Sequence, residues 1–176
     1  PPRVRRCAAS EVYKGPTQGR ILLADPAADP GAGGAPVDLT QLDPNGKPFR
    51  AIRGNRMSMI FQEPMTSLSP LHTIGDQISE ALTLHRRIGQ AEAREMTQEM
   101  LRLVGFPEPA RALKTYPFEL SGGLRQRAMI SMALLCRPAL LIADDPTTAL
   151  DVTIHAPTLT LIHELQGELG LAVLIL

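Results

Sequence analysis

The sequence predicts an α/β protein built around a parallel β-sheet, and three observations support this fold class. An apolar run at residues 140–143 is too short for a helix and is typical of a strand buried on both faces of a parallel sheet. A helical pattern precedes this run, and a second one follows it up to Gly170. Another apolar run then begins at residues 171–176. A strand, a helix and a strand in this order form one right-handed parallel crossover.

Composition and charge limit the classes of function. The 176 residues are enough for one domain with a hydrophobic core. The 18 basic and 18 acidic residues give a formal net charge of zero, which argues against a general nucleic-acid or membrane-surface binder. No apolar run approaches the roughly 20 residues that a membrane span needs. Cys7 and Cys136 have no metal-like spacing, and Cys136 is expected to be a buried thiol in a cytosolic protein.

Residues 1–50 show little periodicity, and we expect them to form a divergent, partial N-terminal region. Residues 21–23 and 37–40 have the character of a strand pair, separated by a Gly/Pro-rich loop at residues 25–36.

A phosphate-binding loop of the form G-x-x-x-x-G-K-[ST] is not found in this region. The glycines at 31–34 are followed by Ala35 and a proline rather than by lysine and a hydroxyl residue. Lys47 does follow Gly46, but Pro48 stands where the hydroxyl residue is needed. We therefore interpret the glycine-rich stretch as a linker.

The middle of the chain is expected to contain a strand and two helices. Residues 57–61 are predicted to form a buried strand that ends at Gln62. Apolar residues at helical spacing predict amphipathic helices over residues 74–87 and 90–104, with Gly105 as a stop signal. The inward-facing residues of the second helix are Met96, Met100, Leu103 and Val104.

A glycine turn opens the helix that precedes residues 140–143. The hydroxyl of Ser121 can accept from the first-turn N–H groups, and Gly122 and Gly123 place no Cβ atom in the way of a ligand. Bare amides at the positive end of a helix form an anion site, for which phosphate is the obvious ligand. Arg125 and Arg127 are expected either to pair with acids or phosphates or to lie on a solvated face.

Two acids follow the strand at residues 140–143. Asp144 and Asp145 lie at its carboxyl end, where open α/β sheets bind ligands. One carboxylate there can hold Mg²⁺, and its neighbour can orient an attacking water.

The next helix is expected to run to about residue 169, with Leu159, Ile162 and Leu165 facing inward. Asp151 is a candidate N-cap for it. That start would place Pro157 beyond the first turn at a cost of about 3 kcal/mol, so a start at residue 156, with proline at N1, is the predicted solution.

Three stretches carry a resemblance to a known family. They read MIFQEPMTSLSPLHTIGDQI, LSGGLRQR and LLIADDPTTALDVT, and they occur in the order and at the spacing of the Q-loop, signature motif, and Walker B strand with D-loop of ABC-type ATPases. Their amino-acid sequences resemble those of the ATP-binding subunits of bacterial dipeptide, oligopeptide and nickel importers. The resemblance covers roughly residues 52–176.

The resemblance implies a P-loop NTPase-like parallel sheet with helices on both faces, together with the helical subdomain of ABC proteins at about residues 66–135. Residues 51–176 would be a partial ABC ATPase domain, and the chain is expected to be truncated at both ends. It implies ATP and Mg²⁺ as cofactors, and a second ATP-binding subunit in a head-to-tail dimer. Inner-membrane permease subunits are the other implied partners, at the cytoplasmic face of the bacterial inner membrane; nucleic acid is not among them.

By the same resemblance, Ser121, Gly122 and Gly123 would cover the γ-phosphate held by the other subunit, with Asp151 also near the nucleotide. Asp144 would hold Mg²⁺. Gln62 would contact both the metal and the attacking water, because a side-chain amide offers an acceptor and a donor. Asp145 stands where the family has a glutamate that acts as the general base.

The chain also departs from the family pattern. The Walker A loop is missing upstream of Gln62, and the sequence stops before the position of the H-loop histidine. The side chain of Asp145 is one methylene shorter than glutamate, and Leu124 replaces a glutamine or glutamate of the signature motif. Since a misplacement of about 1 Å can cost about 10²-fold in rate, we expect weak hydrolysis.

Two hypotheses follow. The chain is part of an ATP-hydrolysing subunit that drives solute import, or it is a nucleotide-incompetent fragment or accessory module that retains the dimer and permease surfaces. The motifs FQEPMTSL and TTALDVT argue against a non-transport ABC ATPase of DNA repair or translation.

Overall fold

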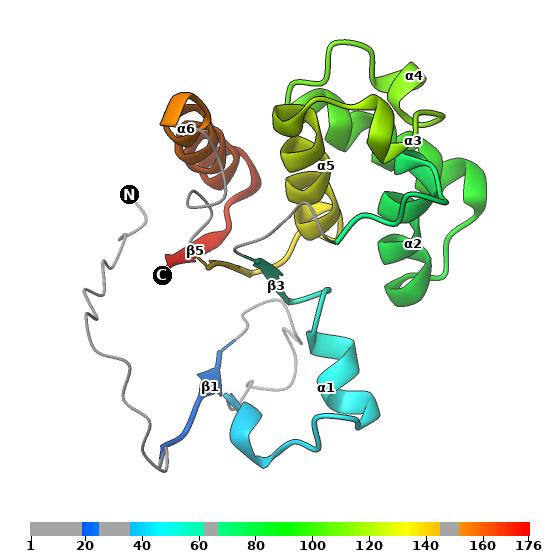
Figure 1. Ribbon diagram of the computed structural model, residues 1–176. Coiled ribbons are helices and arrows are strands. Elements are labelled where there is room, and N and C mark those ends of the chain that lie inside the picture. The colour runs from blue at the N-terminus through cyan, green and yellow to red at the C-terminus, as the bar shows by residue number, and fades with distance from the viewer. Residues whose placement is uncertain (1–18, 25–35, 62–66, 145–151) are drawn as a thin grey trace.

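The structure is a computed structural model that describes residues 19–24, 36–61, 67–144 and 152–176, with side chains from residue 158 onward in the last segment. Figure 1 shows a small parallel sheet with a group of helices on one side of it and a short N-terminal strand pair below. The elements in chain order are β1 (Leu22–Leu23), β2 (Val37–Asp38), η1 (Leu39–Gln41), α1 (Lys47–Ile52), β3 (Met57–Ile60), α2 (Ile74–His85), α3 (Gln90–Leu103), α4 (Pro109–Ala112), η3 (Pro117–Glu119), α5 (Gly122–Leu134), β4 (Leu140–Ala143), α6 (Val152–Leu169) and β5 (Ala172–Ile175).

The sheet that carries the fold has the strand order β3-β4-β5 in the described part of the chain, and both pairings are parallel. In β4, Leu140 pairs with Met57 on one side and with Ala172 on the other. The strand predicted at residues 140–143 is therefore confirmed at both boundaries. Strands are also found from Met57 and after Gly170, as predicted, but the expected burial is wrong for most of their residues. The first of them ends at Ile60, and Phe61 is 55% exposed.

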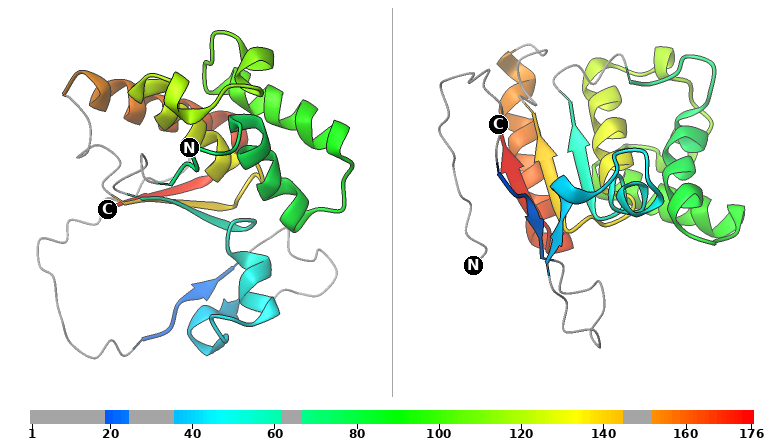
Figure 2. Two further views of the ribbon diagram at one scale, coloured as in Figure 1. Left: turned by 45° about the vertical axis from the view of Figure 1, so that its right-hand side comes forward. Right: turned by 90° about the horizontal axis from the view of Figure 1, so that it is seen from below.

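The two faces of the sheet are covered differently. Figure 2 shows α5 and α6 together on one face, with α1 and the β1–β2 pair on the other side. Leu141 and Ala143 are fully buried, while Leu140 and Ile142 are only half-buried. Ile142 lines an open apolar cavity of about 370 Å³, and residues of α1 line the same cavity. Among the described elements, α5 and α6 pack over one face of this sheet and cover most of it.

The helices α2, α3 and α5 pack against each other beside the sheet, and α5 also contacts β3. The predicted helices match α2 and α3 closely, because apolar residues at 3.6-residue spacing form one buried stripe on each. Met100 and Val104 are buried as predicted, and Met96 and Leu103 pack partly against the same core. Gly105 has a positive φ of 79°, which explains why glycine ends α3.

The N-terminal strand pair is confirmed, in a shorter form than predicted. β1 and β2 are antiparallel, and Arg20 Nε lies 2.6 Å from Asp38 Oδ2. The second strand ends at Asp38 because its carboxylate accepts hydrogen bonds from the backbone and hydroxyl of Thr40, which starts the turn η1. The hydrogen bonds from Thr40 and then Arg20 lower the pKa of the Asp38 carboxyl.

The predicted start of the last long helix at residue 156 is wrong, because α6 begins at Val152 and runs through Pro157. The proline removes one helical hydrogen bond, at a cost of about 3 kcal/mol. Starting four residues earlier keeps a further turn of backbone inside the helix, where its polar groups can be paired. Asp151, the candidate N-cap, lies outside the described residues.

The predicted inward face of α6 is partly wrong. Ile162 and Leu165 are buried, but Leu159 is 40% exposed. The buried stripe starts instead at Thr158, which is 5% exposed and lies four residues before Ile162.

Gly75 provides a test of the packing between α2 and the segment after α4. A Cβ atom at this position would lie 2.5 Å from the backbone oxygen of Leu113. We expect Gly75→Ala to lower the free energy of unfolding by about 1–3 kcal/mol, measured by urea denaturation, because the clash is with backbone that cannot swing away. Gly167→Ala is the matched control: its Cβ would meet nothing, and it should raise stability by up to about 1 kcal/mol. Equal effects of the two substitutions would contradict this packing.

Candidate functional site

The carboxyl ends of the three parallel strands meet at one edge of the sheet, and Asp144 lies there. It directly follows β4, and its N–H donates to the backbone oxygen of Ile60 in β3 at 2.9 Å. The N–H of Leu176 donates in the same way to Ala143 at 2.9 Å. The placement predicted for Asp144 is thus seen directly, whereas Gln62 and Asp145 lie outside the described residues.

The first turn of α5 forms the second part of the candidate site. Ser121 is its N-cap, and the hydroxyl accepts from the N–H of Leu124 at 3.4 Å, as predicted. In the described part of the chain, no acceptor is found for the N–H groups of Gly122 and Gly123. A Cβ atom added at either glycine would meet no atom within 4 Å. Both N–H groups are therefore bare donors in the described chain, and the space where a side chain would stand is open at each glycine.

These two groups of residues lie at different places on the molecule. Figure 1 shows the N-terminal end of α5 near α3 and α4, well apart from the edge where β5 and the C-terminus lie. The structure therefore brings Ser121, Gly122 and Gly123 together but does not bring them to Asp144 within one chain.

The arginines after the glycine turn, Arg125 and Arg127, bind backbone oxygens that the sequence did not predict. The Arg125 Nε atom donates to the backbone oxygen of Leu120 at 3.0 Å, and the Arg127 guanidinium donates to the backbone oxygen of Val104. Arg127 Nη1 also lies 3.4 Å from the oxygen of Gly105. Carbonyls at the end of α3 carry partial negative charge and have no helical donor, so they attract a cation. Both arginines thus bind backbone oxygens, and neither forms an ion pair with a described acid.

Sequence reasoning missed Gln126, which ties α5 to α6. Its side chain is 3% exposed, and its Oε1 atom accepts from the hydroxyl of Thr158 at 2.9 Å. A signal was present, since Gln126 lies four residues before Ile130 on the buried face of α5. This hydrogen bond holds α5 in position against α6.

Two aromatic side chains precede the glycine turn. The rings of Tyr116 and Phe118 are stacked, with centroids 5.5 Å apart and planes 15° apart. Phe118 is 67% exposed, so most of its surface faces solvent despite this contact.

Cys136 is buried, as predicted. Its thiol donates to the backbone oxygen of Ala81 at 3.4 Å, and Arg86 donates to the Cys136 carbonyl oxygen at 3.0 Å. Burial raises the pKa of the Cys136 thiol, and the Arg86 charge opposes that shift in part. A raised pKa keeps the group protonated and unreactive.

The described residues also bear on other classes of site. They contain no group of three or more His, Cys, Asp or Glu side chains that could hold a metal ion. None of their helices is long and apolar enough to cross a membrane.

Comparisons with known proteins agree with this geometry. The family model described as ABC transporter matches residues 14–148. The probable peptide ABC transporter ATP-binding protein y4tR of Sinorhizobium fredii is 59% identical over 133 residues, which are 76% of this chain and 40% of that protein. The dipeptide transport ATP-binding protein DppD of Bacillus subtilis is 47% identical over 160 residues, which are 91% of this chain and 44% of that protein. The chain thus spans less than half the length of these two relatives.

Among solved structures, the dimeric ATP-binding cassette MJ0796 bound to ADP and Pi matches with a TM-score of 0.65 and 29% identity, over 79% of this chain and 58% of that one. The fold is therefore the α/β fold of ABC ATPase cassettes, related to the P-loop NTPases. The chain belongs to the ABC transporter family.

Arg127 gives a test of how α5 is held in place. We expect Arg127→Ala to lower the free energy of unfolding by about 1.5 kcal/mol or more, because it removes charged hydrogen bonds to the end of α3. Arg94→Ala removes an exposed arginine from α3 itself and should change stability by less than about 0.5 kcal/mol. Thermal unfolding of both variants measures the difference, and indistinguishable melting curves would show that the Arg127 contacts contribute nothing.

Proposed function

We propose that this chain supplies the signature helix and the metal-binding strand end of an ATP-binding subunit, in which ATP binding and hydrolysis drive the import of peptides or similar solutes. The observation that carries the proposal is the bare glycine turn at the start of α5. The solute class rests on the relatives, whose names describe peptide and dipeptide transport.

Nothing in the described chain requires a glycine at either position of this turn. Glycine in a helix costs about 1 kcal/mol relative to alanine. Gly122 and Gly123 have no positive φ, and a Cβ atom on either would have room. What remains is the close approach of an outside group to their N–H donors, and an anion is favoured at this end of the helix dipole. A phosphate of ATP supplies that anion.

The sheet edge offers a fitting ligand for Mg²⁺. Asp144 is half-exposed, and no hydrogen bond or ion pair of its carboxylate to another described residue is found. Mg²⁺ prefers carboxylate oxygens and keeps several waters. In our proposal, Gln62 contacts the metal and the attacking water, Asp145 orients that water as general base, and Asp151 lies near the nucleotide.

The separation between Ser121 and Asp144 within one chain supports a dimer. In a head-to-tail arrangement, the α5 turn of one copy covers a phosphate whose magnesium is held at the sheet edge of the other. The similar cassette MJ0796 is described as dimeric. We further propose that residues 66–135 form the helical subdomain, following a divergent region at residues 1–50. The subunit would bind inner-membrane permeases at the cytoplasmic face of a bacterial inner membrane.

Ser121 distinguishes the capping role from the phosphate role. Aspartate also caps helices well, so Ser121→Asp should keep the stability of the chain within about 0.5 kcal/mol, while Ser121→Ala should lower it by about 1 kcal/mol. In the full-length subunit, the added negative charge beside the amides should abolish ATP-dependent dimerisation. Light scattering with and without ATP measures the dimer, and urea denaturation measures the stability. Normal ATP-dependent dimerisation of Ser121→Asp would refute the phosphate role.

Asp145 tests the rate of hydrolysis. If the shorter side chain holds the attacking water out of position, Asp145→Glu in the full-length subunit should raise ATP turnover, by up to about 10²-fold. Phosphate release at saturating ATP measures the rate, with Asp145→Asn as the variant that removes the base and should be slower. An unchanged turnover in Asp145→Glu would defeat the hypothesis of weak hydrolysis.

A further inference from the structure

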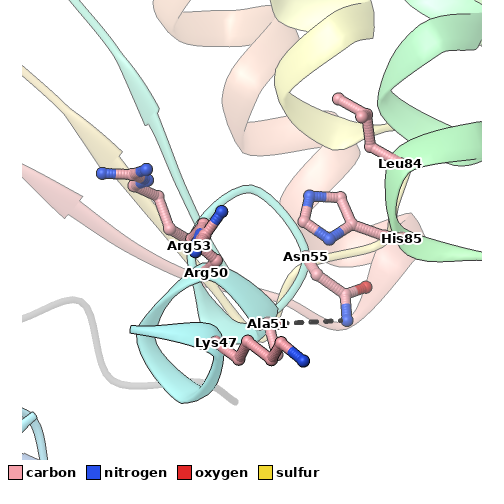
Figure 3. A pocket seen from close by; sticks show the side chains of 7 residues that line it. All are labelled: Lys47, Arg50, Ala51, Arg53, Asn55, Leu84 and His85. Carbon is pink, nitrogen blue, oxygen red and sulfur yellow. Dashed lines mark hydrogen bonds between the residues drawn. The ribbon is translucent and has the colours of Figure 1, made fainter. Parts of the chain in front are cut away.

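A groove lies between α1, the turn at residues 54–56 and the end of α2. Its volume is about 590 Å³. It is lined by Lys47, Arg50, Ala51, Arg53, Asn55, Leu84 and His85. Figure 3 shows Lys47 and Arg50 projecting from α1, and His85 reaching from α2 toward the turn that carries Asn55.

The lining of this groove is cationic in a chain whose net charge is zero. It contains three side chains of fixed positive charge and no carboxylate. The sequence from residue 44 to residue 62 contains four basic residues and no acid. Among the described residues, the ion pairs lie elsewhere, at Arg20–Asp38, Arg102–Glu99 and Arg111–Glu108. The charges of Lys47 and Arg50 are therefore not matched by a carboxylate of the described chain.

The walls of the groove are held in place by backbone contacts. Gly54 has a φ of 84°, and its N–H donates to the backbone oxygen of Met57 at 2.7 Å. A Cβ atom at Gly54 would lie 3.0 Å from His85 Nε2, so the imidazole rests closely against the turn. The side-chain amide of Asn55 donates to the Ala51 oxygen at 3.3 Å, which ties the turn to α1. The turn and the His85 imidazole are thus held in place, while the side chains of Lys47 and Arg50 are exposed.

The groove is separate from the candidate nucleotide site. Its turn leads directly into the first residue of β3, whereas Asp144 lies beside the last residue of that strand. A four-residue strand spans roughly 13 Å, so the groove and the acidic edge are at opposite ends of the sheet. No residue of the first turn of α5 lines the groove.

We propose that this groove binds a phosphate-bearing anion, as a site additional to the one for nucleotide. The Lys47 ammonium and the Arg50 guanidinium on α1, with the His85 imidazole on α2, suit the several oxygens of a phosphate group. The volume has room for more than one phosphate. The anion has two possible sources, a soluble polyphosphate or the headgroup of an anionic phospholipid. The inference stands whether or not the proposed transport function holds.

The test uses the 176-residue chain and two probes. Inorganic tripolyphosphate is titrated by calorimetry, and vesicles of phosphatidylglycerol are compared with vesicles of phosphatidylcholine in a flotation assay. The double variant Lys47→Ala/Arg50→Ala should weaken binding about tenfold or more, because both side chains are exposed and act through charge. Arg94→Ala/Lys114→Ala is the matched control, since it removes the same charge from exposed positions on other elements and should leave binding unchanged.

Each outcome decides the matter. Tripolyphosphate binding that only the groove variant loses supports a soluble anion. Binding to phosphatidylglycerol vesicles alone, lost by the same variant, supports a lipid headgroup. The proposal is overturned if neither probe binds, if both double variants weaken binding equally, or if Ser121→Asp abolishes tripolyphosphate binding while the groove variant retains it, since the anion then sits at α5.

Discussion

The structure depends on the parallel, in-register pairing of β4 with β3 and β5. This pairing buries Leu141 and Ala143 completely and fixes where each strand ends. A shift of β4 by one residue would turn Leu141 and Ala143 away from the face on which they are buried. It would also remove Asp144 from the edge beside Ile60. One packing constraint thus determines both the core and the position of the acid.

The second requirement is that α5 keeps a fixed position between the sheet and the other helices. Its buried face contacts β3, α2 and α3, while Gln126 bonds to α6 and Arg127 bonds to the end of α3. The described contacts that hold this helix lie mostly along its body. In its first turn, Ser121 caps the helix and Arg125 bonds to the Leu120 oxygen. The described chain offers no acceptor to the N–H groups of Gly122 and Gly123, so these donors can serve a ligand without cost to the core.

Local signals in the sequence predicted much of this arrangement. The strand at residues 140–143, the helices α2 and α3, and the Ser121 cap follow from short-range periodicity and capping rules, and all were found. The sequence could not show that Arg127 binds a carbonyl 23 residues away, or that Gln126 bonds 32 residues away, because such partners depend on tertiary packing. The start of α6 was missed because the local cost of Pro157 was given more weight than an added helical turn.

The central claim is that the sheet register places Asp144 at the edge formed by the ends of β3 and β4. Amide hydrogen exchange followed by NMR tests this claim most directly, since the Asp144 N–H donates to the Ile60 oxygen. The account predicts that the Asp144 amide exchanges as slowly as those in the middle of β4, with a protection that approaches the global free energy of unfolding. Exchange of the Asp144 amide as fast as that of Gly89, an exposed residue between helices, would contradict the account.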